Sequence, residues 1–138
     1  MSWANLTKRI HNFTVRAPSK PACLTEDKTT TYQELSNKIA QFISYFHRKN
    51  IHHKNISVHL PLSENLIALS ISIFDSNNTY CPLDINMNIE EMNEFITLGN
   101  IDFIISELTE DLKGIRIVNL NEISEFPTTF EYPKEKKY

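Results

Sequence analysis

The chain has 138 residues, the size of one ordinary domain, and can bury a core without disulfides or a structural metal. Hydrophobic residues make up 41% and charged residues 22%, a balance typical of a globular chain and not of a disordered one. The net charge of −3 and the pI near 5.9 give no electrostatic reason to bind nucleic acid, so we expect no nucleic-acid partner.

The two cysteines, Cys23 and Cys81, form no metal-type pair and lie among apolar or β-prone neighbours. This favours free, buried thiols and a cytoplasmic location. The N-terminus has no apolar core of signal-peptide length. The longest apolar region, residues 60–74, is interrupted by polar residues, so we expect a buried helix and no membrane partner.

Residues 5–15 are predicted to form an amphipathic helix with Leu6, Ile10 and Phe13 facing inward. Two prolines end it, and residues 22–25 and 29–32 are β-prone on either side of a polar turn. The clearest helix signal follows at Thr31, which forms a capping-box pattern with Glu34. Apolar residues recur at helical spacing from residue 35 to 46 and predict one buried face.

Residues 56–60 alternate like a strand, and Ser63 can cap the helix that follows. This helix, residues 63–74, is apolar nearly all the way round, so we expect other structure to enclose it. Asn77 and Asn78 should end it, because asparagine tolerates the left-handed conformation of a helix end. Residues 79–83 are predicted to be extended.

Asn88 and Glu91 predict another capped helix, which Gly99 should end. Residues 101–105 form a continuous apolar run typical of a strand buried on both faces. We also expect a short helical turn over residues 110–113, a last strand over 115–118 and a flexible tail over 124–138. The alternation of strands and helices predicts one α/β domain with a mainly parallel sheet and flanking helices.

Residues 30–35 read Thr-Thr-Tyr-Gln-Glu-Leu, and residues 74–84 end in Tyr-Cys-Pro-Leu-Asp. These two stretches resemble the first and second core motifs of adenylation domains of nonribosomal peptide synthetases and their acyl-CoA synthetase and luciferase relatives, the adenylate-forming (AMP-binding) superfamily. The resemblance covers residues 8–118. It implies the N-terminal part of the family's fold. It also implies a structural role for the motif residues Thr31, Tyr32, Glu34, Leu35, Tyr80, Pro82, Leu83 and Asp84.

The second motif departs from the family pattern at two positions, where Asp75 replaces a lysine and Asn77 replaces a glycine. In addition, residues 85–88 replace a stretch that usually contains proline. These changes suggest a divergent or degenerate copy. Asparagine can still adopt the left-handed turn, so we expect the bend to survive.

The resemblance implies no catalytic, cofactor-binding or metal-binding residue in this chain. The family's phosphate-binding loop, adenine and ribose contacts and late catalytic lysine all lie beyond these residues, and the two glycines present cannot form such a loop. We therefore expect an N-terminal fragment of an amino-acid- or acyl-activating domain that is inactive alone. A protein partner carrying the rest of the domain would complete it as an ATP-dependent ligase that uses ATP and Mg²⁺.

Other interpretations stay open. A non-catalytic, truncated module could serve protein–protein interaction by docking a synthetase neighbour, or the motif match could be accidental in a flavodoxin-like binding domain. Tyr80 and Asp84 lie at a strand end, where α/β proteins bind ligands, but a packed ring and a turn-capping carboxylate explain them more simply. The five histidines show no convincing metal-ligand spacing; they are His11, His47, His52, His53 and His59. No serine lies in a nucleophile-elbow sequence.

Overall fold

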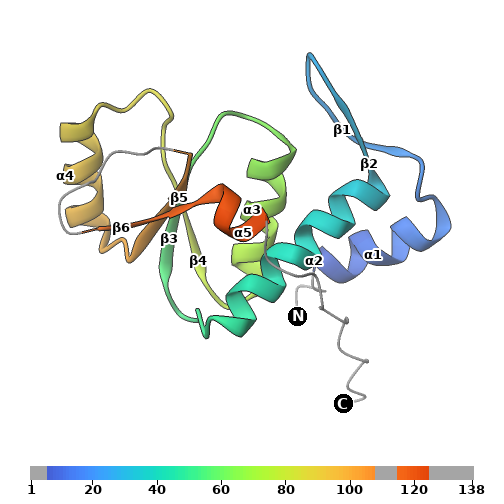
Figure 1. Cartoon of the computed structure of the whole chain (residues 1–138), viewed down its shortest axis with the longest axis horizontal. Helices are drawn as coiled ribbons and strands as arrows, with labels where there is room; N and C mark the ends of the chain where they lie inside the picture. Colours follow the sequence, from blue (N-terminus) through green and yellow to red (C-terminus); the bar gives the residue numbers. More distant parts are fainter. Residues whose placement is uncertain (1–5, 108–114, 125–138) are drawn as a thin grey trace.

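The computed structural model describes residues 6–107 and 115–124. Its elements are, in chain order, α1 (Leu6–Arg16), β1 (Pro21–Leu24), β2 (Thr29–Thr31), α2 (Tyr32–Arg48), β3 (Asn55–His59), α3 (Glu64–Asp75), β4 (Thr79–Pro82), α4 (Ile89–Gly99), β5 (Phe103–Ser106), β6 (Arg116–Asn119) and α5 (Leu120–Ser124) (Figure 1). The predicted α/β class is confirmed. In the described residues, no helix is long and apolar enough to cross a membrane.

Four strands form a parallel sheet in the order β4-β3-β5-β6. β1 and β2 pair antiparallel in a separate hairpin, whose turn is closed by a hydrogen bond from the Thr25 amide to the Lys28 carbonyl at 2.9 Å. The chain turns back between β4 and β5, so β3 and β5 are neighbours although α3, β4 and α4 separate them in sequence. The predicted mainly parallel sheet is confirmed.

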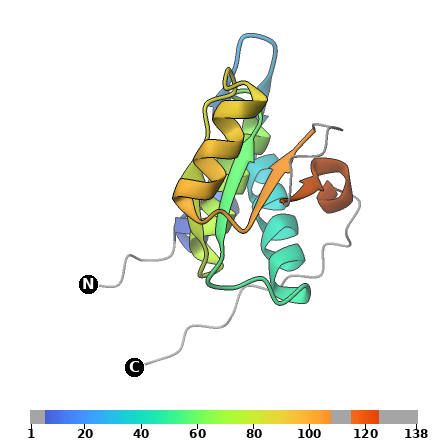
Figure 2. The ribbon, with the colours of Figure 1, turned by 90° about the vertical axis from the view of Figure 1, so that its left-hand side faces the viewer.

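Helices cover both faces of the sheet (Figure 1). α2, α3 and α5 pack on one face, α4 covers the other, and α1 and the hairpin pack on α2. When the left-hand side of the molecule in Figure 1 faces the viewer, α4 lies in front of the strands (Figure 2). Alternation along β3 sorts the side chains, because Ile56 and Val58 join the larger core while Ser57 and His59 point to the face that α4 covers.

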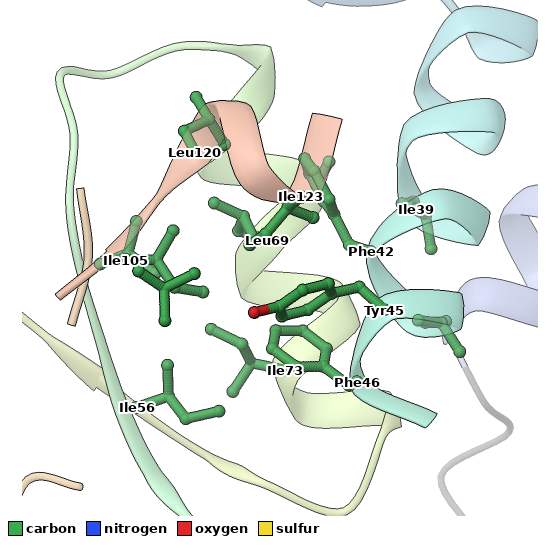
Figure 3. Packing of buried hydrophobic residues seen from close by; sticks show 14 of the residues in the cluster. Ile39, Phe42, Tyr45, Phe46, Ile56, Leu69, Ile73, Ile105, Leu120 and Ile123 are labelled. Carbon is green, nitrogen blue, oxygen red and sulfur yellow. The ribbon is translucent and has the colours of Figure 1, made fainter. Parts of the chain in front are cut away.

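The larger core lies between α2, α3, α5 and the sheet (Figure 3). Its fully buried side chains include Phe42 and Phe46 of α2 and Ile73 of α3. The core under α4 is much smaller and centres on Met92, Ile96, Ile101 and Ile104. Burying a side chain of this size stabilises the fold by about 1.5–3 kcal/mol, so the α2–α3 side of the sheet contributes most of the hydrophobic stability.

The predicted helix starts are confirmed by geometry. Thr31 and Asn88 form complete capping boxes with Glu34 and Glu91, and the Ser63 hydroxyl accepts a hydrogen bond from the Leu66 amide. β5 is buried along its whole length, as the apolar run predicts.

The predicted end of α4 at Gly99 is confirmed, and the left-handed conformation that follows it (φ 50°) belongs to Asn100. Three other expectations need correction. Leu6 is 45% exposed rather than inward, because the side chains that α1 buries fully are Thr7 and Thr14.

Ser124, expected to open the tail, is the last residue of α5, a helix that the sequence analysis missed. The predicted turn at residues 110–113 and the remainder of the tail lie outside the described residues. The expected enclosure of α3 is wrong in part, because its outer side is only half-buried and Phe74 is 60% exposed.

Candidate functional site

The first motif holds the start of α2. The Thr31 hydroxyl accepts from the Glu34 amide at 3.2 Å, and the Thr31 amide donates to the Glu34 carboxylate at 3.1 Å. Hydrogen bonds from the Thr31 backbone and side chain to the ionised carboxylate keep the pKa of Glu34 below its ordinary value. Thr31 and Glu34 therefore each satisfy the other's backbone amide at the start of α2.

The other two residues of the first motif connect α2 to its neighbours. The Tyr32 ring packs on Phe13 of α1 with centroids 4.4 Å apart, and its amide donates to the Lys20 carbonyl at 2.9 Å. Leu35 is 4% exposed and belongs to the larger core. The first motif thus joins α1, the hairpin connection and α2.

Position 75, where the family motif has lysine, has a role in folding here. Asp75 ends α3 and accepts a hydrogen bond from the Thr7 amide at 2.8 Å, with a second from the Thr7 hydroxyl. Thr7 is 1% exposed and lies in the first turn of α1, which has no acidic residue of its own there. The Asp75 carboxylate therefore satisfies an otherwise orphan amide and complements the positive end of the helix dipole.

The asparagines after α3 make the bend that the family makes with glycine. Asn77 has φ 62°, so the prediction that it adopts the left-handed conformation is confirmed. Asn78 is buried, and its side-chain amide donates to the Ile51 carbonyl at 2.9 Å while its oxygen accepts from the Lys54 amide at 3.0 Å. The bend thus links the end of α3 to the approach to β3.

The end of the second motif leads the chain from the sheet edge to α4. Tyr80 is half-buried against the larger core, and Leu83 packs against the smaller one. Pro82, which has no amide hydrogen, closes β4 at an edge of the sheet. The Asp84 carboxylate accepts a hydrogen bond from the Asn86 amide at 2.9 Å, so it caps a turn.

A histidine–serine pair, which the sequence analysis did not bring together, lies where β3 and β5 end. The His59 Nε2 is 3.2 Å from the Ile85 carbonyl oxygen, an acceptor, so this nitrogen carries the hydrogen. The Ser106 hydroxyl is 3.4 Å from His59 Nδ1 and 3.2 Å from the His59 carbonyl oxygen. Ser106 is completely buried, so the pair ties β3, β5 and the turn before α4 together and offers no accessible nucleophile.

A wide, shallow hollow of about 600 Å³ lies beside this pair, at the carboxyl end of a parallel sheet where α/β proteins bind ligands. Four of its seven lining residues are apolar, and the Asn88 amide oxygen already caps α4. The hollow is lined by His59, Ile85, Met87, Asn88, Ile89, Glu90 and Met92. This lining has no cradle of backbone amides or cations for phosphate.

The remaining histidines and the cysteines form no reactive centre in the described residues. The rings of His47 and His52 have centroids 6.2 Å apart, and His52 Nδ1 is 3.2 Å from the Ser76 carbonyl. No three metal-ligating side chains come together in the described part. Both cysteines are free thiols, but only Cys23 is buried as expected, whereas Cys81 is half-buried. Desolvation raises the pKa of both thiols, which disfavours the nucleophilic thiolate.

No family model and no curated protein matches the sequence. Solved structures do match the fold. The Klebsiella oxytoca NpsA-ThdA, an artificially fused adenylation–PCP di-domain of a nonribosomal peptide synthetase, is 14% identical with a TM-score of 0.79 over 94% of this chain and 26% of that one. The K. oxytoca NpsA N-terminal subdomain is 14% identical, with a TM-score of 0.79 over 94% of this chain and 35% of that one. VinN in complex with L-aspartate is 18% identical, with a TM-score of 0.75 over 86% of this chain and 36% of that one.

This chain therefore spans about a quarter to a third of the length of the structures that it matches. The identities are too low to transfer a substrate, but the fold agrees over nearly the whole chain. The motif resemblance points to the same fold. The chain has the α/β fold found in the N-terminal subdomain of nonribosomal peptide synthetase adenylation domains.

Proposed function

We propose that these 138 residues are an N-terminal scaffold of an adenylation domain that activates an amino acid or another acyl group. On this proposal the chain is inactive alone, and a partner chain carrying the rest of the domain completes it. The observation that carries the scaffold assignment is the fold agreement over 94% of this chain with the N-terminal subdomain of an adenylation domain.

An incompletely covered apolar surface on α3 supports a partner. Ile67 and Ile71 are half-buried on the outer side of this helix, and Phe74 on the same side is 60% exposed. Exposed apolar side chains that share one helix face are typical of a contact surface. We propose that the completing chain packs on this outer side of α3.

The chemistry of the completed domain would come from outside the described residues. Adenylation requires donors and Mg²⁺ around the ATP phosphates and a pocket for the substrate carboxylate. The polar side chains of the two motifs bond to neighbouring parts of the fold instead, so their proposed contribution is to hold the fold that receives the partner. ATP, Mg²⁺, ligase activity and a cytoplasmic location remain predictions for the assembled enzyme.

A second candidate function is a non-catalytic docking module that retains the fold, and the second motif favours it. The lysine position of the motif is occupied by Asp75, which anchors α1, and its glycine position by Asn77. A module selected only for folding could accept both changes. The two candidates differ in what the partner contains.

Affinity capture of the tagged chain from its native extract, with the bound proteins identified by mass spectrometry, separates these candidates. The proposal predicts a partner that contains a glycine-rich phosphate loop and the late lysine, and predicts that Phe74→Glu abolishes its capture. Leu98→Glu is the matched control, because Leu98 is 78% exposed on α4, across the sheet from α3. Capture only of synthetase neighbours without a phosphate loop would support the docking module instead.

A further inference from the structure

Two helices of equal length lie at opposite ends of the long axis of the molecule. α1 and α4 each have 11 residues, and the sheet, α2 and α3 separate them (Figure 1). Each helix buries one side against its own neighbours and turns the other outward. Their outward sides carry opposite charge.

The outward side of α4 is acidic with an apolar end. Glu90, Glu94 and Leu98 follow one another at four-residue spacing, opposite the buried Met92 and Ile96. Leu98 is 78% exposed. The described residues provide neither Glu90 nor Glu94 with an ion pair, and α4 contains no basic residue, so this charge is not neutralised within the described fold.

The outward side of α1 has the complementary composition. Arg9 and Arg16 are exposed opposite the buried Thr7 and Thr14, and Val15, which flanks this side of the helix, is 70% exposed. α1 contains no acidic residue. It thus combines cations with one exposed aliphatic side chain, as α4 combines anions with one.

The same separation of charge is present in the sequence up to residue 112, and the small net charge conceals it. Residues 1–59 contain nine Lys or Arg residues and three Asp or Glu residues. Residues 60–112 contain ten Asp or Glu residues and no Lys, Arg or His. Charge of one sign at each end of a molecule steers molecules of the same kind to meet end to end.

We propose that the outward side of α4 binds the outward side of α1 of a second copy of this chain. In this contact Glu90 and Glu94 face Arg9 and Arg16, and the exposed Leu98 and Val15 supply the apolar part. A second copy is favoured over a foreign basic partner because the complementary helix, with matching length, charge and aliphatic content, is present in the chain itself. This inference goes beyond the proposed function and involves a different surface from α3.

The contact joins unlike surfaces, so it produces a head-to-tail row unless the geometry closes it into a ring. Exposed ion pairs contribute little individually, and salt screens them over about 8 Å at physiological ionic strength. The association should therefore be weak, concentration-dependent and sensitive to salt.

Sedimentation velocity over a range of protein concentrations tests this contact with two charge-reversed variants. One carries Glu90→Lys with Glu94→Lys, and the other carries Arg9→Glu with Arg16→Glu. Each should weaken self-association by at least about tenfold in dissociation constant, because like charges then face each other. The matched control, Glu26→Lys with Asp27→Lys in the exposed hairpin turn, changes the net charge as the first variant does and should associate like the wild type.

Mixing the two charge-reversed variants provides the decisive result, because each then presents the complement of the other. Equimolar mixing should restore association to the wild-type range, and 0.5 M salt should weaken it in both samples. Circular dichroism checks that each variant is folded. If the charge-reversed α4 variant does not fold, Glu90→Gln with Glu94→Gln replaces it. A wild-type chain that remains monomeric at every concentration overturns the proposal and leaves a foreign basic segment as the occupant of α4.

Association that the reversed variants and the hairpin control change equally also overturns it. Phe74→Glu should leave self-association unchanged, since Phe74 belongs to the proposed partner surface on α3. Loss of self-association in that variant would place the contact on α3 and overturn the pairing of α1 with α4. The test of the contact between α1 and α4 is therefore independent of whether an adenylation partner binds α3.

Discussion

Restoring the family's lysine at position 75 should destabilise this protein. Asp75 accepts two hydrogen bonds from Thr7, which is 1% exposed in the first turn of α1. Asp75→Lys removes both acceptors and places a cation at the positive end of the α1 dipole. Buried donors left unsatisfied cost about 1–3 kcal/mol, and the unfavourable dipole interaction costs about 0.3–1 kcal/mol more. We expect a loss of about 3 kcal/mol in the free energy of unfolding.

Urea denaturation followed by circular dichroism measures this loss. For a urea dependence of about 2 kcal/mol per molar, a loss of about 3 kcal/mol lowers the midpoint by about 1.5 M. Asp75→Asn keeps one acceptor oxygen and should lose only about 1 kcal/mol, which orders the three proteins. Asp27→Lys in the exposed hairpin turn, which makes the same change of charge, should stay within about 0.5 kcal/mol of the wild type.

The reasoning is refuted if Asp75→Lys and the Asp27→Lys control have the same midpoint. Position 75 would then tolerate the family residue without consequence. The contact between Asp75 and Thr7 would not anchor α1, and the departure from the family motif would have no structural explanation.

The same denaturation assay tests three further consequences of the fold, and chemical modification tests a fourth. Asn77→Gly should leave stability within about 1 kcal/mol, whereas Asn77→Val should lose about 1–2 kcal/mol because φ is positive there; equal stabilities would contradict this. Thr31→Ala should cost about 1 kcal/mol by removing the N-cap. Because the folded-state pKa of Glu34 is lowered, its carboxylate stabilises the fold above the ordinary pKa of 4.5, and this stabilisation is lost as the pH falls through the lowered pKa. The free energy of unfolding of Glu34→Gln should therefore fall less steeply than that of the wild type as the pH is lowered through this range. Iodoacetamide at neutral pH should modify Cys81 before Cys23, and both more slowly than a free cysteine, because both pKa values are raised and Cys23 is 7% exposed; mass spectrometry showing Cys23 modified first would contradict this.

Features set by neighbouring residues in sequence were predictable. The capping boxes at Thr31 and Asn88 need only the cap and a glutamate three residues later, and both formed as predicted. The bend at Asn77 likewise depends on one residue's tolerance of positive φ. Alternation of short apolar strands with helices was enough to predict the parallel sheet.

Features that depend on which strands are neighbours were not predictable from one sequence. His59 and Ser106 are 47 residues apart and meet only because β3 pairs with β5 in that register. The contact between Asp75 and Thr7 similarly depends on how α1 packs beside α3. Only its local half, a carboxylate at the end of an apolar helix, was visible in advance.

Helix α1 shows why an apolar pattern can mislead at a helix end. Leu6 was expected inward, yet Thr7 and Thr14 occupy the buried side and Leu6 is 45% exposed. The hydroxyls make burial possible, because Thr7 donates to Asp75 and Thr14 donates to the Ile10 carbonyl at 2.6 Å. Satisfied threonines at helical spacing thus replaced the expected apolar contact.

ATP–pyrophosphate exchange, measured on the isolated chain and on the complex captured from the native extract, tests the proposed function most directly. The assay supplies Mg²⁺, ATP and a pool of amino acids and small carboxylic acids, and it follows labelled pyrophosphate entering ATP. We predict no exchange by the chain alone. The complex should catalyse exchange only when its amino-acid or carboxylic-acid substrate is present, and this exchange should be lost when Phe74→Glu prevents assembly of the complex. Exchange by the isolated chain, or none by a complex whose partner carries the phosphate loop and the late lysine, would contradict the proposal.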